Sequence, residues 1–213
     1  MAVSLYGASL FGRAYKSCEI RGLNNAPGGG DGVDDDVQFR LGADGAGSIK
    51  DRRHGICCGI TIAWIVGFCH KRDEAVNTTN FARYFTDVLR FQGAYLKDNK
   101  GTVGSIDDLN AIQPEGLRRS GNGKCTGPQL SGLFPGGTWA AYLGIWHHAI
   151  GVGVNDRTLR SSRYCIMDPN AGLFKYDGEA AFVDDLRQLV EARRLRKGEA
   201  AGAKVSYTFF KKT

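Results

Sequence analysis

The feature that most constrains the fold is an apolar segment at residues 55–69, which reads GICCGITIAWIVGFC. Apolar side chains would cover every side of a helix built from this segment, and basic residues follow it directly. A helix that is apolar all round is normally buried. A fully buried strand is the alternative interpretation, but the length of the segment favours a helix. We therefore expect a central helix enclosed by other elements.

Two more helices are expected before the middle of the chain. Residues 81–98 carry apolar side chains at spacings of three and four, which predicts a helix that begins after Asn80. A capping-box pattern at Ser105 predicts a short helix that Pro114 ends. Residues 114–137 are rich in Gly, Ser and Pro and are interpreted as a loop.

Short apolar runs dominate the second half of the chain and predict strands. They occupy residues 138–146, 147–154, 163–168, 172–176 and, as a last alternating run, 204–210. Residues 179–197 predict an amphipathic helix that stops at Gly198. The apolar residues of this helix that we expect to face inward are Phe182, Leu186, Leu189, Val190 and Leu195. Helices followed by strands, then a helix and a strand, predict an α+β fold with an antiparallel sheet.

Length and composition fit one globular domain with a lead-in segment. The chain has 213 residues, of which 42% are hydrophobic and 23% charged, as in ordinary globular proteins. Residues 22–47 are rich in Gly and Asp, which is typical of a flexible loop. We therefore expect residues 1–47 to be a Gly/Asp-rich lead-in and residues 48–213 to form the folded domain.

The net charge of +6 is compatible with anionic partners, but it is mild, and an ordinary solvated surface is the favoured explanation. Four basic residues, Arg193, Arg194, Arg196 and Lys197, end the last predicted helix, where cations offset the helix dipole. Docking to an anionic membrane surface is the alternative for this cluster. The Gly-rich stretch at residues 121–124 lacks the remaining residues of a phosphate-binding loop, and no nucleic-acid partner is expected.

The N-terminal residues lack the basic cluster and apolar run of a standard secretory signal. No stretch approaches the roughly 18 apolar residues of a membrane span. We therefore expect any secretion to use a route without a standard signal peptide.

The six cysteines are expected to be free thiols, because the chain is neither short nor cysteine-dense. Zinc sites need close pairs of ligands, and the order Cys57-Cys58 then Cys69-His70 does not supply them. We expect no metal site and no cofactor.

Cys57 lies near the start of the predicted central helix and is a candidate nucleophile. The helix dipole and the free backbone N–H groups at a helix N-terminus stabilise a thiolate, which is the nucleophilic form of cysteine. The same N–H groups can hold the oxyanion of a tetrahedral intermediate. A buried cysteine that only fills space is the alternative. Cys58 should point about 100° away around the helix and is interpreted as a packing residue.

His148 opens the second predicted strand, and Asp168 ends the third. If the turn between these strands is centred at Thr158, the two residues lie opposite each other with side chains on the same face. A carboxylate beside an imidazole fixes its tautomer and stabilises the imidazolium. A slip of one residue would put His147 in the place of His148. A simple Asp-Pro-Asn turn is the alternative explanation for Asp168.

Three motifs resemble those of the YopT/AvrPphB family of papain-like cysteine proteases. Residues 55–65, GICCGITIAWI, are similar to the nucleophile motif of that family. The triplet at residues 148–150, HAI, looks like its histidine strand, and residues 168–174, DPNAGLF, are similar to its acid motif. The motifs occur in the family's order of Cys, His and Asp, and the resemblance spans about residues 50–210.

The resemblance implies a papain-like fold, in which a central helix carries Cys57 and an antiparallel sheet carries His148 and Asp168. It implies a cysteine endopeptidase of bacterial effector or toxin type that is secreted and cleaves specific host proteins in the host cell cytoplasm. One departure concerns the oxyanion. Papain-like enzymes commonly place Gln or Asn shortly before the nucleophile as an oxyanion donor, whereas this chain has Asp51 and Arg52 there.

Two other functions are compatible with the same residues. An amidase, deamidase or acyltransferase could use the same three side chains, because fold and triad alone do not set the reaction. A non-catalytic binding module could keep the shape, but the intact Cys57, His148 and Asp168 argue against it. The Asp-Pro-Asn sequence favours the protease.

Overall fold

The computed structural model describes residues 16–18, 57–71, 87–88, 90–92, 94, 115–146, 148–156 and 162–213. These residues form a seven-stranded antiparallel sheet with the strand order β1-β6-β5-β4-β3-β7-β2. The strands are β1 (Lys16–Cys18), β2 (Leu117–Cys125), β3 (Trp139–Gly144), β4 (Ala149–Asn155), β5 (Arg163–Asp168), β6 (Gly172–Tyr176) and β7 (Val205–Lys212). The helices are α2 (Cys57–Lys71), α5 (Gly127–Leu130), the 3-10 turn η4 (Ser131–Leu133) and α6 (Glu179–Arg196).

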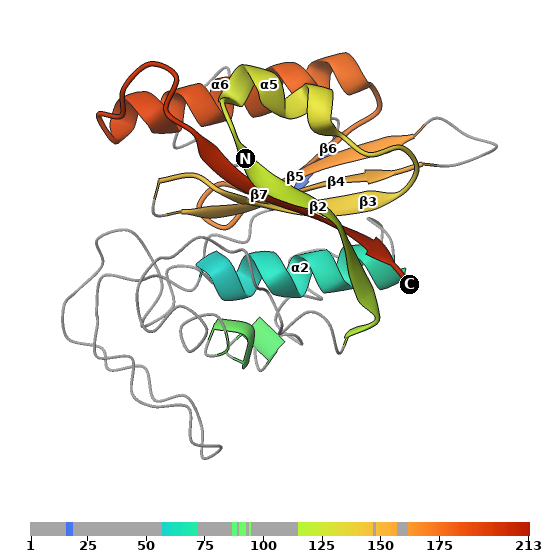
Figure 1. The fold of residues 1–213 in the computed structure, drawn as a ribbon. Coiled ribbons are helices and arrows are strands. Elements are labelled where there is room, and N and C mark those ends of the chain that lie inside the picture. Colours follow the sequence, from blue (N-terminus) through green and yellow to red (C-terminus); the bar gives the residue numbers. More distant parts are fainter. Residues whose placement is uncertain are drawn as a thin grey trace.

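The sheet lies between two helical layers. Figure 1 shows α2 against one face and α5 with α6 against the other. One core fills the space between α2 and the sheet, and its largest members are Trp64 and Tyr142. The second core packs α5 and α6 against the other face and centres on Trp139 and Phe182. The α+β fold with a central buried helix, expected from the sequence, is confirmed.

Helix α2 approaches the sheet closely because β4 carries glycines on the side that faces it. A Cβ atom at Gly151 would lie 2.5 Å from Cε3 of Trp64, and one at Gly153 would lie 2.8 Å from Cε1 of Phe68. No side chain fits in such a space, so the two aromatic rings lie directly on the strand backbone. The Thr61 hydroxyl donates a hydrogen bond to the Ala149 carbonyl at 3.2 Å and joins helix and strand at one end of this contact.

The inward stripe of α6 differs from the sequence prediction at one position. Phe182, Leu186, Leu189 and Val190 are buried as expected, but the inward position of Leu195 is wrong, because this side chain is 63% exposed. Arg193 is fully buried instead. Arg193 follows Leu189 by four residues and Val190 by three, so it lies on the same buried face of the helix. Leu195 lies two residues later, about 200° further around the helix.

The interpretation of residues 114–137 as a loop is wrong, because they contain β2, α5 and η4. Among the described strands β2 has a single neighbour, β7, and it stands at the edge of the sheet. Its inner residues alternate between exposed and half-buried. An edge strand with little burial has no apolar alternation to reveal it.

Two other sequence predictions fall partly or wholly outside the described residues. The helix expected at residues 81–98 is helical at every position that the structure describes, whereas the one expected from Ser105 lies outside them. Strand β1 pairs with β6, so three residues of the 1–47 segment belong to the sheet. The division of the chain at residue 48 stays a prediction.

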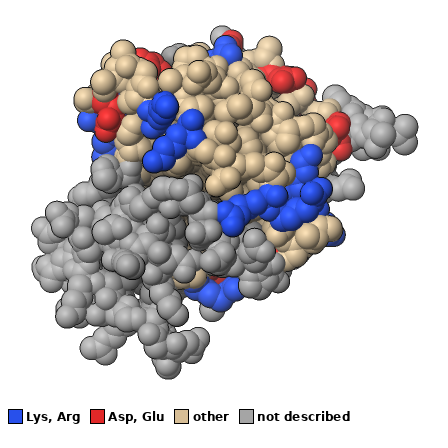
Figure 2. Space-filling model, in the orientation of Figure 1, with Lys and Arg blue, Asp and Glu red and all other residues tan. Residues whose placement is uncertain are grey.

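Basic side chains gather at the edge of the sheet that β2 and β7 form (Figure 2). Arg118 pairs across the strands with Lys211, and Leu117 pairs with Lys212. Arg118 and Lys212 are exposed. No helix in the described part of the chain has the length and hydropathy needed to cross a membrane.

Candidate active site

Cys57 is the first residue of α2, at the end of the helix where backbone N–H groups lack intrahelical acceptors. Its exposure is 9%, so the thiol is almost enclosed but lies at the boundary of the core. The nearly uniform apolar surface of α2 buries the helix and thereby fixes the N-terminus against the sheet. The structure thus places this cysteine where the helix dipole favours a thiolate.

The first turn of α2 is held by Gln92, a residue that sequence analysis does not single out. The Gly59 N–H donates a hydrogen bond of 2.8 Å to Oε1 of Gln92, and both groups are buried. A Cβ atom at Gly59 would lie 2.2 Å from the Val88 carbonyl oxygen, so only glycine permits this approach. Gly59 and Gln92 are 33 residues apart in the chain, and no local sequence pattern predicts such a contact.

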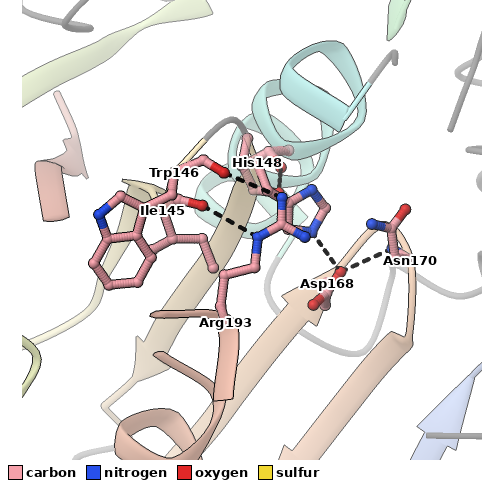
Figure 3. Close-up of polar contacts among 8 residues, drawn as sticks. Ile145, Trp146, His148, Asp168, Asn170 and Arg193 are labelled. Atoms are coloured by element: carbon pink, nitrogen blue, oxygen red, sulfur yellow. Dashed lines mark hydrogen bonds and ion pairs between the residues drawn. The ribbon is translucent and has the colours of Figure 1, made fainter. Parts of the chain in front are cut away.

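His148 and Asp168 meet at the end of β4 and β5. Nε2 of His148 lies 2.8 Å from Oδ1 of Asp168 (Figure 3). The exposed fractions of the two side chains are 2% and 0%. A hydrogen bond that water cannot reach is strengthened by the low local dielectric. The Nε2–Asp168 contact leaves Nδ1 as the ring nitrogen available to a thiol.

The hairpin register that brings them together differs from the expected one. Gly151 pairs with Met167, and this register extended by one residue places Asp168 opposite Ile150. The sequence-based assumption that Asp168 lies directly opposite His148 is therefore wrong by two residues. Side-chain orientation in a strand repeats every two residues, so both side chains still share a face and meet diagonally.

The carboxylate of Asp168 is fixed by the turn that follows it. The Asn170 N–H donates to the same Oδ1 atom at 2.8 Å, and the Ala171 N–H donates to the Asp168 carbonyl at 3.1 Å. This is the turn that the Asp-Pro-Asn sequence predicts. The turn and the histidine contact occur together, because Oδ1 of Asp168 accepts one hydrogen bond from the Asn170 N–H and contacts Nε2 of His148 as well.

The pKa values of the cysteine and the histidine move in opposite directions. Burial lowers the pKa of His148, but the charge and hydrogen bond of Asp168, together with those of Cys57, outweigh burial and raise that pKa to about 9. A hydrogen bond from Cys58 lowers the pKa of Cys57, and burial opposes it. The hydrogen bond and charge of His148 then lower the pKa of Cys57 further, to well below its usual value. The arrangement therefore favours a thiolate beside an imidazolium.

Cys58, which the sequence analysis interprets as a packing residue, also makes hydrogen bonds within the site. Its Sγ accepts a hydrogen bond of 3.1 Å from the Tyr142 hydroxyl, and its thiol donates to Cys57. The other described cysteines behave differently. Burial raises the pKa of Cys69 to about 12, and it raises the pKa of Cys125 as well. All five cysteines with described side chains are free thiols.

Three residues considered in the sequence analysis lie outside the described part of the chain. They are His147, Asp51 and Arg52. Among the described residues no group of three or more His, Cys, Asp and Glu side chains could hold a metal ion.

Comparison with solved structures places this fold. The chain is similar to AvrPphB, an avirulence protein of Pseudomonas, with 13% identity and a TM-score of 0.52, over 73% of this chain and 90% of that one. It also matches PatoxP, a cysteine protease-like domain of the Photorhabdus asymbiotica toxin PaTox, with 8% identity and a TM-score of 0.43, over 75% and 49% of the two chains. A ubiquitin-specific protease from the murine cytomegalovirus tegument protein M48, solved with a ubiquitin-based suicide substrate, matches with 12% identity and a TM-score of 0.47, over 74% and 78%.

No protein-family model matches the chain, and no curated protein sequence does so either. The likeness to AvrPphB shows the fold. The chain therefore has the papain-like fold that its three motifs predict.

Proposed function

We propose that this protein is a cysteine endopeptidase in which Cys57 is the nucleophile, His148 the general base and acid, and Asp168 the residue that orients the imidazole. One observation carries the proposal. A buried His148–Asp168 contact of 2.8 Å stands beside a helix N-terminal thiol whose pKa is lowered. Groups whose pKa values are pushed apart in this way are typical of catalytic pairs.

The reaction follows from the ion pair. The Cys57 thiolate attacks the carbonyl carbon of a peptide bond and forms a C–S bond, while the carbonyl oxygen becomes an oxyanion. The Cys57 N–H at the start of α2 can donate to that oxyanion. The His148 imidazolium then gives its proton to the leaving amine as the C–N bond breaks. His148 next takes a proton from water, whose oxygen attacks the thioester and releases the acid and the Cys57 thiolate.

The proposed substrate is a protein of a host cell, and the proposed place of action is the host cytoplasm after secretion without a standard signal peptide. The sequence motifs and the shared fold with an avirulence protein support this. An amidase, deamidase or acyltransferase would use the same covalent chemistry. The three side chains are compatible with all of these enzymes, so the reaction type is identified from the products that the protein forms.

The first experiment measures the rate of iodoacetamide alkylation at each cysteine against pH, by peptide mass mapping. We expect Cys57 to react fast near about pH 6, well below the ordinary thiol pKa of about 8.5, and to lose this advantage in His148→Ala. Cys69, whose pKa is raised to about 12, is an internal control that should stay unreactive. A wild-type Cys57 that reacts as an ordinary thiol would contradict the proposal.

A second experiment identifies the bond that is cleaved. The wild-type protein and Cys57→Ala are each added to a eukaryotic cell lysate, and new protein N-termini are mapped by mass spectrometry. A protease produces new N-termini only with the wild-type protein. Glutamine-to-glutamate conversion, or acyl transfer without new N-termini, would favour the alternative enzymes.

A further inference from the structure

The structure contains a buried cation next to the candidate site that the proposed mechanism does not use. Arg193 on α6 has no exposed surface, although it is a charged residue in the last turn of an otherwise amphipathic helix. A buried charge is unfavourable unless hydrogen bonds satisfy it. Its neighbour Arg194 has the more usual environment, an ion pair with the exposed Glu191.

The acceptors of Arg193 belong to the turn that leads into β4. Its Nε donates to the Ile145 carbonyl at 3.4 Å, and its Nη2 donates to the Trp146 carbonyl at 3.2 Å. Figure 3 shows the contacts from the Arg193 guanidinium group to the carbonyl oxygens of Ile145 and Trp146. The planar guanidinium presents several donors in a fixed fork, so it can hold two successive carbonyl groups at once.

The held turn is strained at Trp146. Its φ is 48°, which makes it the one non-glycine residue with a positive φ among those that the structure describes. Bulky side chains disfavour this region of backbone conformation, and strained residues of this kind persist only where surrounding contacts hold them. The Ile145 N–H donates to the His148 carbonyl at 2.8 Å and closes the turn.

A continuous set of contacts therefore joins α6 to the candidate site. Arg193 binds the carbonyls of Ile145 and Trp146, and Ile145 binds the backbone of His148. The His148 ring in turn binds Asp168. A cation at a helix C-terminus can also act on the helix dipole. That role does not require acceptors on a different element, whereas the carbonyls of Ile145 and Trp146 both lie in the turn after β3.

We propose that Arg193 is a positioning residue for the reaction: it holds the strained turn at Trp146 and thereby directs the His148 ring at Cys57 and Asp168. The inference rests on the proposed function, because it assigns a role relative to the Cys57–His148 pair. It also gives a function to a residue that the sequence alone places in a surface cluster of basic side chains.

The test compares Arg193→Gln with Arg194→Gln, a matched change one residue along the same helix. Two quantities are measured: the alkylation rate of Cys57 against pH, and the pKa of His148 from the NMR signals of its ring. We expect Arg193→Gln to slow the alkylation of Cys57 near about pH 6 by tenfold or more and to lower the pKa of His148. Arg194→Gln should leave both quantities unchanged.

A double variant tests the route through the turn. Glycine adopts positive φ without strain, so Trp146→Gly removes the need for Arg193 to hold the turn. Trp146→Gly in the Arg193→Gln protein should restore most of the Cys57 reactivity. Failure of this rescue, or a folded Arg193→Gln with the wild-type profile, would overturn the inference.

Removal of a buried cation can also prevent folding. If Arg193→Gln alone does not fold, the inference is tested with the double variant and with Arg193→Lys. Lysine keeps the positive charge but lacks the planar set of donors that holds two carbonyl groups. We expect Arg193→Lys to slow the alkylation of Cys57, and a lysine variant with the wild-type profile would overturn the inference. Two measurements distinguish a failure of the proposed function from a failure of the proposed role of Arg193. An ordinary thiol at Cys57 in the wild type contradicts the proposed function, whereas an unchanged His148 pKa in the variants contradicts the role of Arg193.

Discussion

At the scale of single residues, the pKa values of Cys57 and His148 set a pH window for the proposed reaction. The pKa of His148 is raised to about 9, so the imidazole keeps its proton up to that pH and loses it above. The pKa of Cys57 is lowered, so the thiolate persists well below the pH at which an ordinary thiol is protonated. Peptide cleavage needs both the thiolate and the proton on His148. We therefore expect kcat/KM to form a plateau that falls above pH about 9, and a rate that keeps rising through that pH would contradict the assignment.

Asp168 controls the alkaline limit of this window. Asp168→Asn removes the charge that raises the pKa of His148, so the alkaline limb of the pH profile should move to lower pH. The rate on the plateau should fall by roughly two orders of magnitude or more, because the tautomer and orientation of the ring are no longer fixed. The pH profile of cleavage in the two proteins measures both effects. An alkaline limb at the same pH in the variant would show that Asp168 does not set it.

Cys58 is expected to tune the nucleophile. Its hydrogen bond to Cys57 is the largest contribution that lowers the pKa of the Cys57 thiol. Cys58→Ala should therefore raise this pKa and slow the alkylation of Cys57 at about pH 6 several-fold. Cys125→Ala, which removes a thiol from the core on the other side of the sheet, is the control and should have no effect. Equal profiles for the two variants would show that Cys58 only fills space.

How far the site could be predicted depends on how local each signal is. Cys57 follows from one apolar helix, and Asp168 from the turn sequence after it, so both are visible in short windows. His148 needs a hairpin register, and its assignment tolerates an error of two residues only because strand faces repeat with that period. Gln92 and Arg193 act through partners 33 and 48 residues away, and no periodic pattern encodes such contacts.

At the scale of elements, the contact between α2 and β4 depends on the absence of side chains. Gly151→Ala would place a Cβ atom 2.5 Å from the Trp64 ring, which cannot move because the core is filled around it. Overpacking of this kind should lower the free energy of unfolding by about 1–3 kcal/mol. Chemical denaturation measures it, with Gly132→Ala as the control, since nothing lies within 4 Å of a Cβ atom there. Equal stability of the two variants would mean that α2 can shift away from the sheet at little cost.

The extent of burial decides which strands can be predicted from the sequence. Strands β3 to β6 are predictable because burial on both faces makes them apolar runs bounded by turn residues. Strand β2, LRRSGNGKC, has only Leu117 and Cys125 buried, and its sequence resembles a loop. Its strand character comes from pairing with β7, which runs from Leu117 to Cys125 with an irregularity between Arg119 and Gly121. This tertiary effect is not contained in local propensity.

At the scale of the whole molecule, the described residues include exposed basic side chains at a place that the sequence does not indicate. The basic cluster that ends α6, for which membrane docking is the alternative interpretation, contains Arg193, which is buried, and Arg194, which pairs with Glu191. Only Arg196 and Lys197 of the four are exposed. The exposed Arg118 and Lys212 lie instead on the β2–β7 edge, next to Lys211. We therefore propose this edge, rather than the end of α6, as the surface that meets an anionic membrane.

Vesicle sedimentation tests this placement. Each basic residue near an anionic surface contributes about 1 kcal/mol, so replacement of both Arg118 and Lys212 by Glu should weaken binding to phosphatidylserine vesicles by roughly 30-fold or more at low salt. Arg187→Glu on the exposed face of α6 changes the net charge on the other side of the sheet and should have a smaller effect. Charged side chains on an edge strand also prevent pairing with a second sheet. If the double variant binds vesicles as the wild type does, the membrane proposal is wrong, and protection of the edge remains the role of the charged side chains there.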